Sequence, residues 1–160
     1  MIDLENNMEP TRIYSLMDTA SGNPIIYNGK TYAFLDRIEI PSGKMRIKVT
    51  FISTNSNWKQ GIIFKTKGLF EIEDGKIPHS TILWEHTAPK EVIIDITSKN
   101  KTLIVCNAWD TGKGTIDYWY QSCGMQIEEI DGYKIYNCND GYPDEDFDDL
   151  IFKIEFLDVI

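Results

Sequence analysis

The sequence has no long apolar run and little positive charge. No stretch of its 160 residues approaches the ~18 consecutive apolar residues of a membrane-spanning helix. Its 16 Lys and Arg are outnumbered by 25 Asp and Glu, and the formal net charge of −9 argues against general binding to nucleic acid or anionic lipid. The first residues, Met-Ile-Asp-Leu-Glu-Asn-Asn, contain neither a basic start nor an apolar stretch, which predicts no signal peptide. We therefore expect a soluble, acidic protein that is either cytoplasmic or the trimmed form of a secreted one.

Cysteine and histidine are scarce. Cys106, Cys123 and Cys138 form no C-x-x-C pair, and their spacing matches no zinc-site pattern. The odd count favours reduced thiols, and a Cys123–Cys138 disulfide would require the strands around them to align. No feature of the sequence places His79 or His86 beside a thiol, and the common hydrolase, metalloprotease and kinase signatures are missing. The sequence favours a protein without enzymatic activity, although paired carboxylates leave a carbohydrate-active enzyme open.

Helical periodicity is also missing, because the dominant period of the apolar residues is two. In residues 44–51 four apolar side chains alternate with four polar ones, so that one face meets a core and the other meets water. Residues 102–108 are nearly all apolar, which predicts a central strand buried on both faces. Further strands are expected at residues 92–96, 125–130, 133–138 and 150–156.

Turn signals separate these strands. Asp131-Gly132 is a two-residue hairpin signal, and other glycine-containing turns recur along the chain. Roughly ten short strands with frequent turns and no long helix are typical of a β-sandwich or barrel. We predict an all-β, antiparallel two-sheet β-sandwich, for which a jelly roll is one arrangement. Residues 1–10 are expected to form a loose lead-in, and residues 11–160 a single domain.

The acidic residues are unevenly distributed. Residues 131–160 contain nine acidic and two basic groups, a net charge of −7, which leaves only −2 for the rest of the chain. Holding so many carboxylates in one ordered loop costs free energy through like-charge repulsion. A mobile loop, a bound cation or a basic partner would each relieve that repulsion.

Calcium is the cation that these side chains suit, because it takes about 6–8 hard oxygen ligands in flexible geometry. Asp144, Asp146 and Asp148 have the spacing of the first three EF-hand ligands. An EF-hand is nevertheless excluded, because Asp149 replaces the required glycine and residues 150–156 have the period of a strand. We therefore predict a calcium site in a loop before a strand. Its candidate ligands are Asp140, Asp144, Asp146, Asp148 and Asp149.

The segment Asp-Glu-Asp-Phe-Asp-Asp-Leu-Ile-Phe at residues 144–152 resembles the D-x-D-[FY]-[ND]-D-[LV]-[VI] motif of calcium-associated β-sandwich domains in bacterial surface and adhesion proteins. The resemblance covers about ten of the 160 residues. It implies acidic ligands around a metal in a loop that leads into a core strand, with Phe147 as the aromatic anchor. The ligands it implies are Asp144, Asp146, Asp148 and Asp149, of which Asp148 stands where asparagine is common.

A second candidate site follows the apolar strand at residues 102–108. The Gly112-x-Gly114 loop lacks the rest of a phosphate-binding signature, so nucleotide binding is not expected. Exposed aromatic rings stack on sugar rings while nearby Asp side chains hold hydroxyls, which predicts a binding rim here. Two structural alternatives stay open: the aromatics pack in the core, as is expected of Trp109, and Asp110 bends back to amides of its own turn. The candidate rim residues are Trp109, Asp110, Tyr118, Trp119 and Tyr120.

Three functions are compatible with these patterns. The first is a non-enzymatic binding module with a calcium-binding acidic loop that recognises a glycan or a protein surface. The second is an interaction protein of the immunity or inhibitor type, whose acidic face neutralises a basic partner. The third is a carbohydrate-active enzyme, which would need two carboxylates opposed across a cleft.

Overall fold

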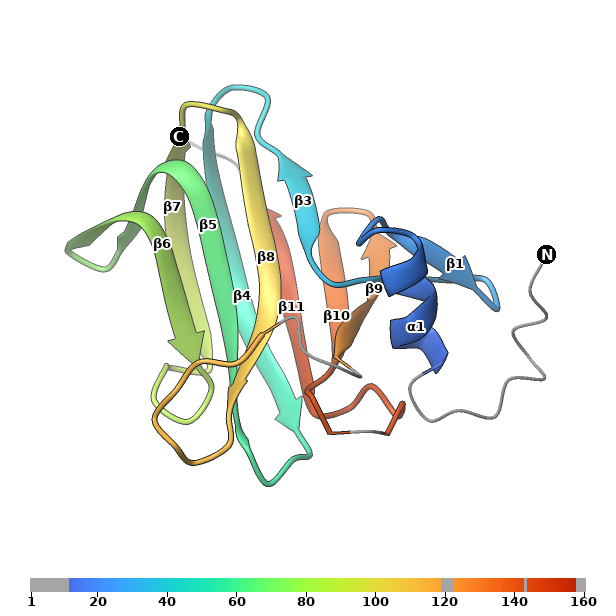
Figure 1. Ribbon diagram of the computed structural model, residues 1–160. Coiled ribbons are helices and arrows are strands. Elements are labelled where there is room, and N and C mark those ends of the chain that lie inside the picture. Colours follow the sequence, from blue (N-terminus) through green and yellow to red (C-terminus); the bar gives the residue numbers. More distant parts are fainter. Residues whose placement is uncertain (1–11, 119–122, 143, 158–160) are drawn as a thin grey trace.

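The computed structural model describes residues 12–118, 123–142 and 144–157, and within these ranges the chain is almost entirely antiparallel β-structure (Figure 1). One short helix precedes the strands. The elements are α1 (Arg12–Thr19), β1 (Ile25–Tyr27), β2 (Lys30–Ala33), β3 (Asp36–Glu39), β4 (Lys44–Thr54), β5 (Lys59–Ile72), β6 (Gly75–Trp84), β7 (Glu91–Ser98), β8 (Thr102–Asp110), β9 (Gly124–Ile130), β10 (Tyr133–Asn139) and β11 (Leu150–Leu157).

The strands join into one curled sheet that resembles half of a barrel (Figure 1). Its order is β1-β2-β9-β10-β11-β4-β7-β5-β8-β3, and β6 pairs with the other edge of β5. The predicted all-β, antiparallel class is confirmed. The hydrogen-bonded ladder runs without interruption from β1 to β3, so a division into two stacked sheets, as in a sandwich or jelly roll, stays a prediction.

The sheet changes direction at β5. The first half of this strand pairs with β8 and the second half pairs with β7, while β6 follows both halves on the opposite edge. Gly68 lies at the change, where a Cβ atom would stand 1.8 Å from the carbonyl oxygen of Thr97. Only glycine allows the two backbones to approach this closely. The split lets β7 and β8 diverge, and the sheet curls around its core as a result.

The main core lies inside this curl and follows the period of two in the sequence. On β4 and β11 every second side chain is buried, so the predicted strands at residues 44–51 and 150–156 are confirmed. Tyr136 of β10 stacks on Phe152 of β11, with ring centroids 4.6 Å apart. The predicted hairpin is also present, because β9 and β10 pair from Ile130 and Tyr133 outward across the Asp131-Gly132 turn.

A second hydrophobic cluster lies beside the main core and contains the helix that the sequence interpretation missed. Ile13 and Met17 of α1 are buried there against Tyr32, Trp109 and Phe147. The cluster therefore joins the helix, the β1–β2 hairpin, the end of β8 and the acidic segment before β11. Residues 1–10, the predicted lead-in, lie outside the described residues.

The three cysteines are buried thiols, and no disulfide links Cys123 to Cys138. Within the ranges given above, no helix is long and apolar enough to cross a membrane.

Candidate metal centre

The acidic loop, residues 140–149, connects β10 to β11 and is held at its base by an asparagine. Asn139 is fully buried; its Nδ2 donates to the backbone oxygen of Asp144 at 2.7 Å, and its Oδ1 accepts from the backbone N–H of Phe147 at 2.7 Å. The side chain of Asn107 on β8 in turn donates to the backbone oxygen of Asn139 at 2.7 Å. These bonds fix the path of the loop without using any carboxylate.

Phe147 anchors the middle of the loop. Its ring is 7% exposed and meets the ring of Tyr32 edge to face at 5.0 Å. Its backbone lies in the left-handed region at φ 53°, where a residue with a side chain is strained. Burial of the ring offsets that strain, and the acidic residues before and after Phe147 are thereby brought to the same side of the structure.

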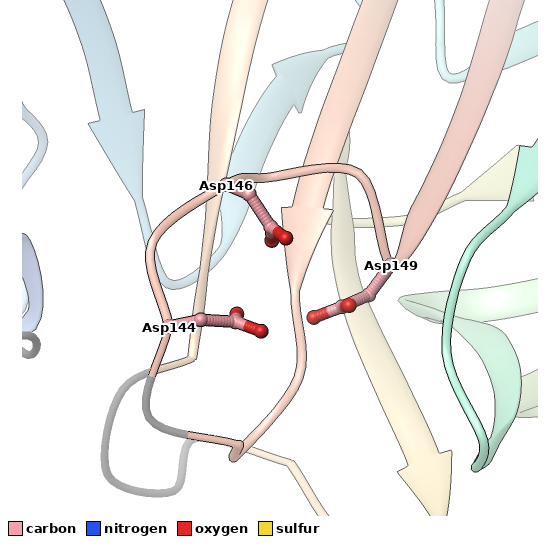
Figure 2. A group of neighbouring side chains, drawn as sticks. All are labelled: Asp144, Asp146 and Asp149. Carbon is pink, nitrogen blue, oxygen red and sulfur yellow. The ribbon is translucent and has the colours of Figure 1, made fainter.

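Three of the predicted ligands meet inside the loop. One carboxylate oxygen from each of Asp144, Asp146 and Asp149 lies within 4.8 Å of the other two. Figure 2 shows the three side chains pointing toward a common space, Asp149 from the end of the loop next to β11 and the others from earlier in the loop. Asp146 is exposed, Asp144 is half-buried and Asp149 is 4% exposed. The group is thus most open to solvent on the Asp146 side, while Asp144 and Asp149 border the pocket described below.

The proximity of the three carboxylates is electrostatically unfavourable. Burial, with added repulsion from neighbouring aspartates, raises the pKa of Asp149 to about 8, even though the backbone N–H of Asp140 donates to it. Burial and the Asp146 charge raise the pKa of Asp144 to about 6. The pKa of Asp146 is raised as well, by burial and by Asp148. The fully ionised form of the group is therefore disfavoured, and a bound proton or cation would relieve the repulsion.

Buried carboxylate oxygens in the loop also lack donors. No hydrogen-bond partner within the described residues reaches Oδ1 of Asp144 or Oδ1 of Asp148, although both atoms are buried. The other oxygen of Asp148 accepts from the side chain of Asn55 at 2.9 Å. A buried oxygen without a donor costs about 1–3 kcal/mol, so these atoms favour an additional positive group.

Asp140 has a different environment from the triplet. It is fully buried, and its Oδ2 accepts from Ser56 at 2.7 Å and from Gln60 at 2.9 Å. Its Oδ1 accepts from the backbone N–H of Tyr142 at 2.9 Å. Both oxygens are thus occupied by protein donors. The structure brings together Asp144, Asp146 and Asp149, and it leaves Asp140 and Asp148 outside that group.

A pocket of about 550 Å³ opens beside the triplet. One wall is the β4–β5 connection, residues 55–58, and the other contains Tyr142, Asp144 and Asp149. The rings of Trp58 and Tyr142 meet edge to face across it at 6.1 Å. The sequence indicates Trp58 as an exposed aromatic candidate for ligand stacking, but nothing in the local pattern shows that residues 55–58 lie against the acidic loop or that Trp58 meets Tyr142.

The predicted aromatic rim is not assembled as expected. Trp109 is 2% exposed and belongs to the second hydrophobic cluster, which is the core packing that the sequence left open as the alternative to a place in the rim. Asp110 caps its own turn by accepting three backbone N–H groups. Tyr118 is 48% exposed beneath the ammonium of Lys65. Trp119 and Tyr120 lie outside the described residues.

Comparisons with known proteins identify no relative: no family model, no curated protein and no solved structure matches the chain. The candidate site therefore rests on its own geometry and chemistry.

Proposed function

We propose that the acidic loop binds a calcium ion through Asp144, Asp146 and Asp149, and that the protein is a non-enzymatic binding module whose recognition surface this ion stabilises. The observation that carries the proposal is the meeting of three carboxylates within 4.8 Å, one of them on a side chain that is 4% exposed. Burial and repulsion raise the pKa values of all three carboxyl groups, so a cation among the oxygens would relieve an unfavourable arrangement.

The chemistry of the donors fits calcium. All three side chains offer hard oxygen ligands, and bidentate contacts would let three carboxylates supply up to about six of the 6–8 ligands that calcium takes. Within the described part of the chain, this group contains no thiolate or imidazole, the ligands that softer metals prefer. The Asp146 side is exposed, so water or a ligand hydroxyl can complete the coordination.

The ion would act structurally. It would offset the repulsion within the loop and hold the loop against β11, next to the pocket lined by Trp58 and Tyr142. A curled sheet that presents an ion-stabilised loop at one end is suited to recognising a glycan or a protein surface. The closer description of the fold as a two-sheet sandwich belongs to this proposal.

Thermal melting with calcium and with EDTA tests the proposal. At a hundredfold excess over the dissociation constant, calcium binding adds about 2.7 kcal/mol to the free energy of unfolding, which corresponds to a rise of roughly 5–10 °C in Tm for a chain of this size. Asp146→Ala removes one charge and one ligand. The variant is expected to melt slightly higher than the wild type in EDTA and to gain little from calcium.

Asp131→Asn is the matched control, because it removes one negative charge from an exposed hairpin turn, where asparagine suits the same backbone. This control should keep the full calcium response. If wild-type Tm is the same in millimolar calcium and in EDTA, the calcium proposal fails. A steep dependence of partner binding on salt, without any dependence on calcium, would then favour the interaction protein with a basic partner.

A further inference from the structure

The pocket beside the acidic loop is built from two chain segments that Asp140 fastens together. One oxygen of Asp140 accepts from Ser56 in the β4–β5 connection, and the other accepts from the backbone N–H of Tyr142 in the acidic loop. Asn55 adds two bonds across the same junction, from its backbone to the backbone oxygen of Asp149 at 3.1 Å and from its side chain to Asp148. The walls of the pocket are thus fixed before any ligand arrives.

The lining combines three kinds of recognition group. Asn55 and Asn57 supply amides, Trp58 and Tyr142 supply aromatic rings, and Asp149 supplies a carboxylate. Tyr142 is 58% exposed, and its ring meets the ring of Trp58 edge to face. The volume of about 550 Å³ lies within the range of small-molecule sites.

Polar atoms at the back of the pocket are left for a ligand. Within the described residues, one hydrogen bond is donated to the Asp149 carboxylate, and it reaches Oδ2 from the backbone of Asp140. Asp149 is 4% exposed, so its remaining oxygen can be satisfied only from the loop interior or from the pocket. Asp144 also lines the pocket, although its Oδ1, which lacks a donor among the residues described, is itself buried and is not open to a ligand in the pocket.

The charge of the lining selects the class of ligand. Asp144 and Asp149 repel phosphate, sulfate and carboxylate groups, and among the residues that the structure describes no Lys or Arg lines the pocket to counter them. A neutral polyol meets no such repulsion. Its hydroxyls can bond to amides and carboxylates, its C–H faces pack on aromatic rings, and adjacent hydroxyls are hard oxygen ligands for calcium.

We infer that this pocket, the Trp58 pocket, binds a neutral saccharide, whose ring packs against Trp58 and Tyr142 while two adjacent hydroxyls complete the coordination of the calcium ion in the acidic loop. The inference rests on the proposed calcium site and adds to it the class of ligand and four residues, Asn55, Asn57, Trp58 and Tyr142.

The test is an NMR titration that follows calcium and sugar separately. The indole N–H signal of Trp58 is assigned with Trp58→Phe, and the backbone amide of Asp146 reports on calcium. The protein is titrated first with calcium chloride and then with methyl α-mannopyranoside or methyl β-galactopyranoside. We expect calcium to shift the Asp146 signal and at least one sugar to shift the Trp58 signal, the second shift being lost in EDTA.

Two variants locate the sugar. Tyr142→Ala removes an exposed ring and is expected to weaken sugar binding at least fivefold while the calcium affinity stays within twofold of the wild type. Tyr118→Ala removes a comparably exposed tyrosine outside the Trp58 pocket and should leave sugar binding unchanged.

The outcomes separate the two proposals. If calcium shifts Asp146 but neither sugar shifts Trp58, the saccharide inference is overturned and the calcium site stands. Sugar binding that is equal in calcium and EDTA, or equal in Tyr142→Ala and the wild type, also overturns the inference as stated. If calcium itself shifts nothing, the proposed function fails, and the saccharide inference fails with it.

Discussion

Two loops of this protein hold carboxylates in opposite ways. In the turn after β8, Oδ1 of Asp110 accepts the backbone N–H groups of Gly112, Lys113 and Gly114 at 2.8, 3.1 and 3.1 Å. These bonds, led by the one from Gly112, lower the pKa of Asp110. In the acidic loop, three carboxylates face one another, and their pKa values are raised.

The difference lies in burial and like-charge repulsion as well as in the supply of donors. The Asp110 turn gives three N–H groups to one carboxylate, and it needs no ion. Three side-chain donors beside the acidic loop bond to groups other than the three carboxylates. Asn139 bonds to the loop backbone, and Ser56 and Gln60 donate to Asp140. What remains is a group of oxygens that a cation can satisfy and the protein alone does not.

The largest expected effect contrasts Asp140 with Asp110. Asp140→Ala leaves Ser56, Gln60 and the Tyr142 N–H without their acceptor in a buried place, which should lower the free energy of unfolding by about 3–5 kcal/mol. Asp110→Ala frees donors that water can reach, so its effect should be much smaller. Urea denaturation of both variants measures the difference. If both variants lose the same free energy of unfolding, burial of the donors does not distinguish the two loops.

A second variant tests the anchor of the acidic loop. Phe147→Ala removes a buried ring from the second hydrophobic cluster and should cost about 3 kcal/mol of stability. Because the loop then loses its fixed path, the calcium affinity should also fall at least tenfold. Tyr142→Ala is the matched control, since it removes an exposed ring from the same loop and should change stability by less than about 0.5 kcal/mol. Unchanged calcium affinity in Phe147→Ala would contradict the anchoring role.

The pH dependence of stability sharpens the contrast without any change of sequence. In the ion-free protein the pKa values of Asp149 and Asp144, about 8 and about 6, lie above their value of 3.8 in the unfolded chain. Between the unfolded value of 3.8 and the raised values of about 6 and about 8, the folded state therefore binds more protons than the unfolded state. The free energy of unfolding falls as pH rises through this range. Asp110, whose pKa is lowered, contributes stability that is lost only in acid.

Melting curves in EDTA from about pH 5 to pH 8 measure this fall, because neither ordinary aspartates nor Asp110 titrate there. Calcium should flatten the curve, since the ion takes the place of the protons. Asp149→Asn should flatten it in EDTA as well. A wild-type Tm that rises through this window in EDTA would mean that the carboxylates are not held close together.

The smallest expected effect belongs to an acidic residue of the loop that does not face the triplet. The backbone N–H of Ile13, in the first turn of α1, donates to Oε2 of Glu145 at 2.9 Å. Glu145→Ala should cost about 1 kcal/mol, as the loss of a helix N-terminal acceptor does, and it should leave the calcium affinity unchanged. Urea denaturation and calorimetric titration measure the two quantities. A large loss of calcium affinity would place Glu145 among the ligands.

The sequence predicted what depends on local period and composition. Alternation located β4, β7, β11 and the β9–β10 hairpin, and charge density located the acidic loop. The helix α1 was missed because it is only eight residues long, although Ile13 and Met17 have the i, i+4 spacing of one buried helix face. Its helical state depends on packing against Tyr32, Trp109 and Phe147, which are distant in sequence.

The composition of the site could be predicted only in part, for the same reason. The sequence indicated five aspartates as candidate ligands. It could not show that Asp140 would accept hydrogen bonds from Ser56 and Gln60, which lie 80 or more residues earlier in the chain. The pairing of Trp58 with Tyr142 likewise depends on the meeting of the β4–β5 connection with the acidic loop, two segments that are distant in sequence. Local pattern gives the kinds of side chain, and long-range topology decides which of them meet.

The most direct measurement of the central claim is a crystal structure of the protein grown in millimolar calcium chloride. The account predicts one strong density peak among Asp144, Asp146 and Asp149, with carboxylate oxygens at about 2.3–2.6 Å from it. Three side chains turned apart into solvent, with no peak between them, would contradict it.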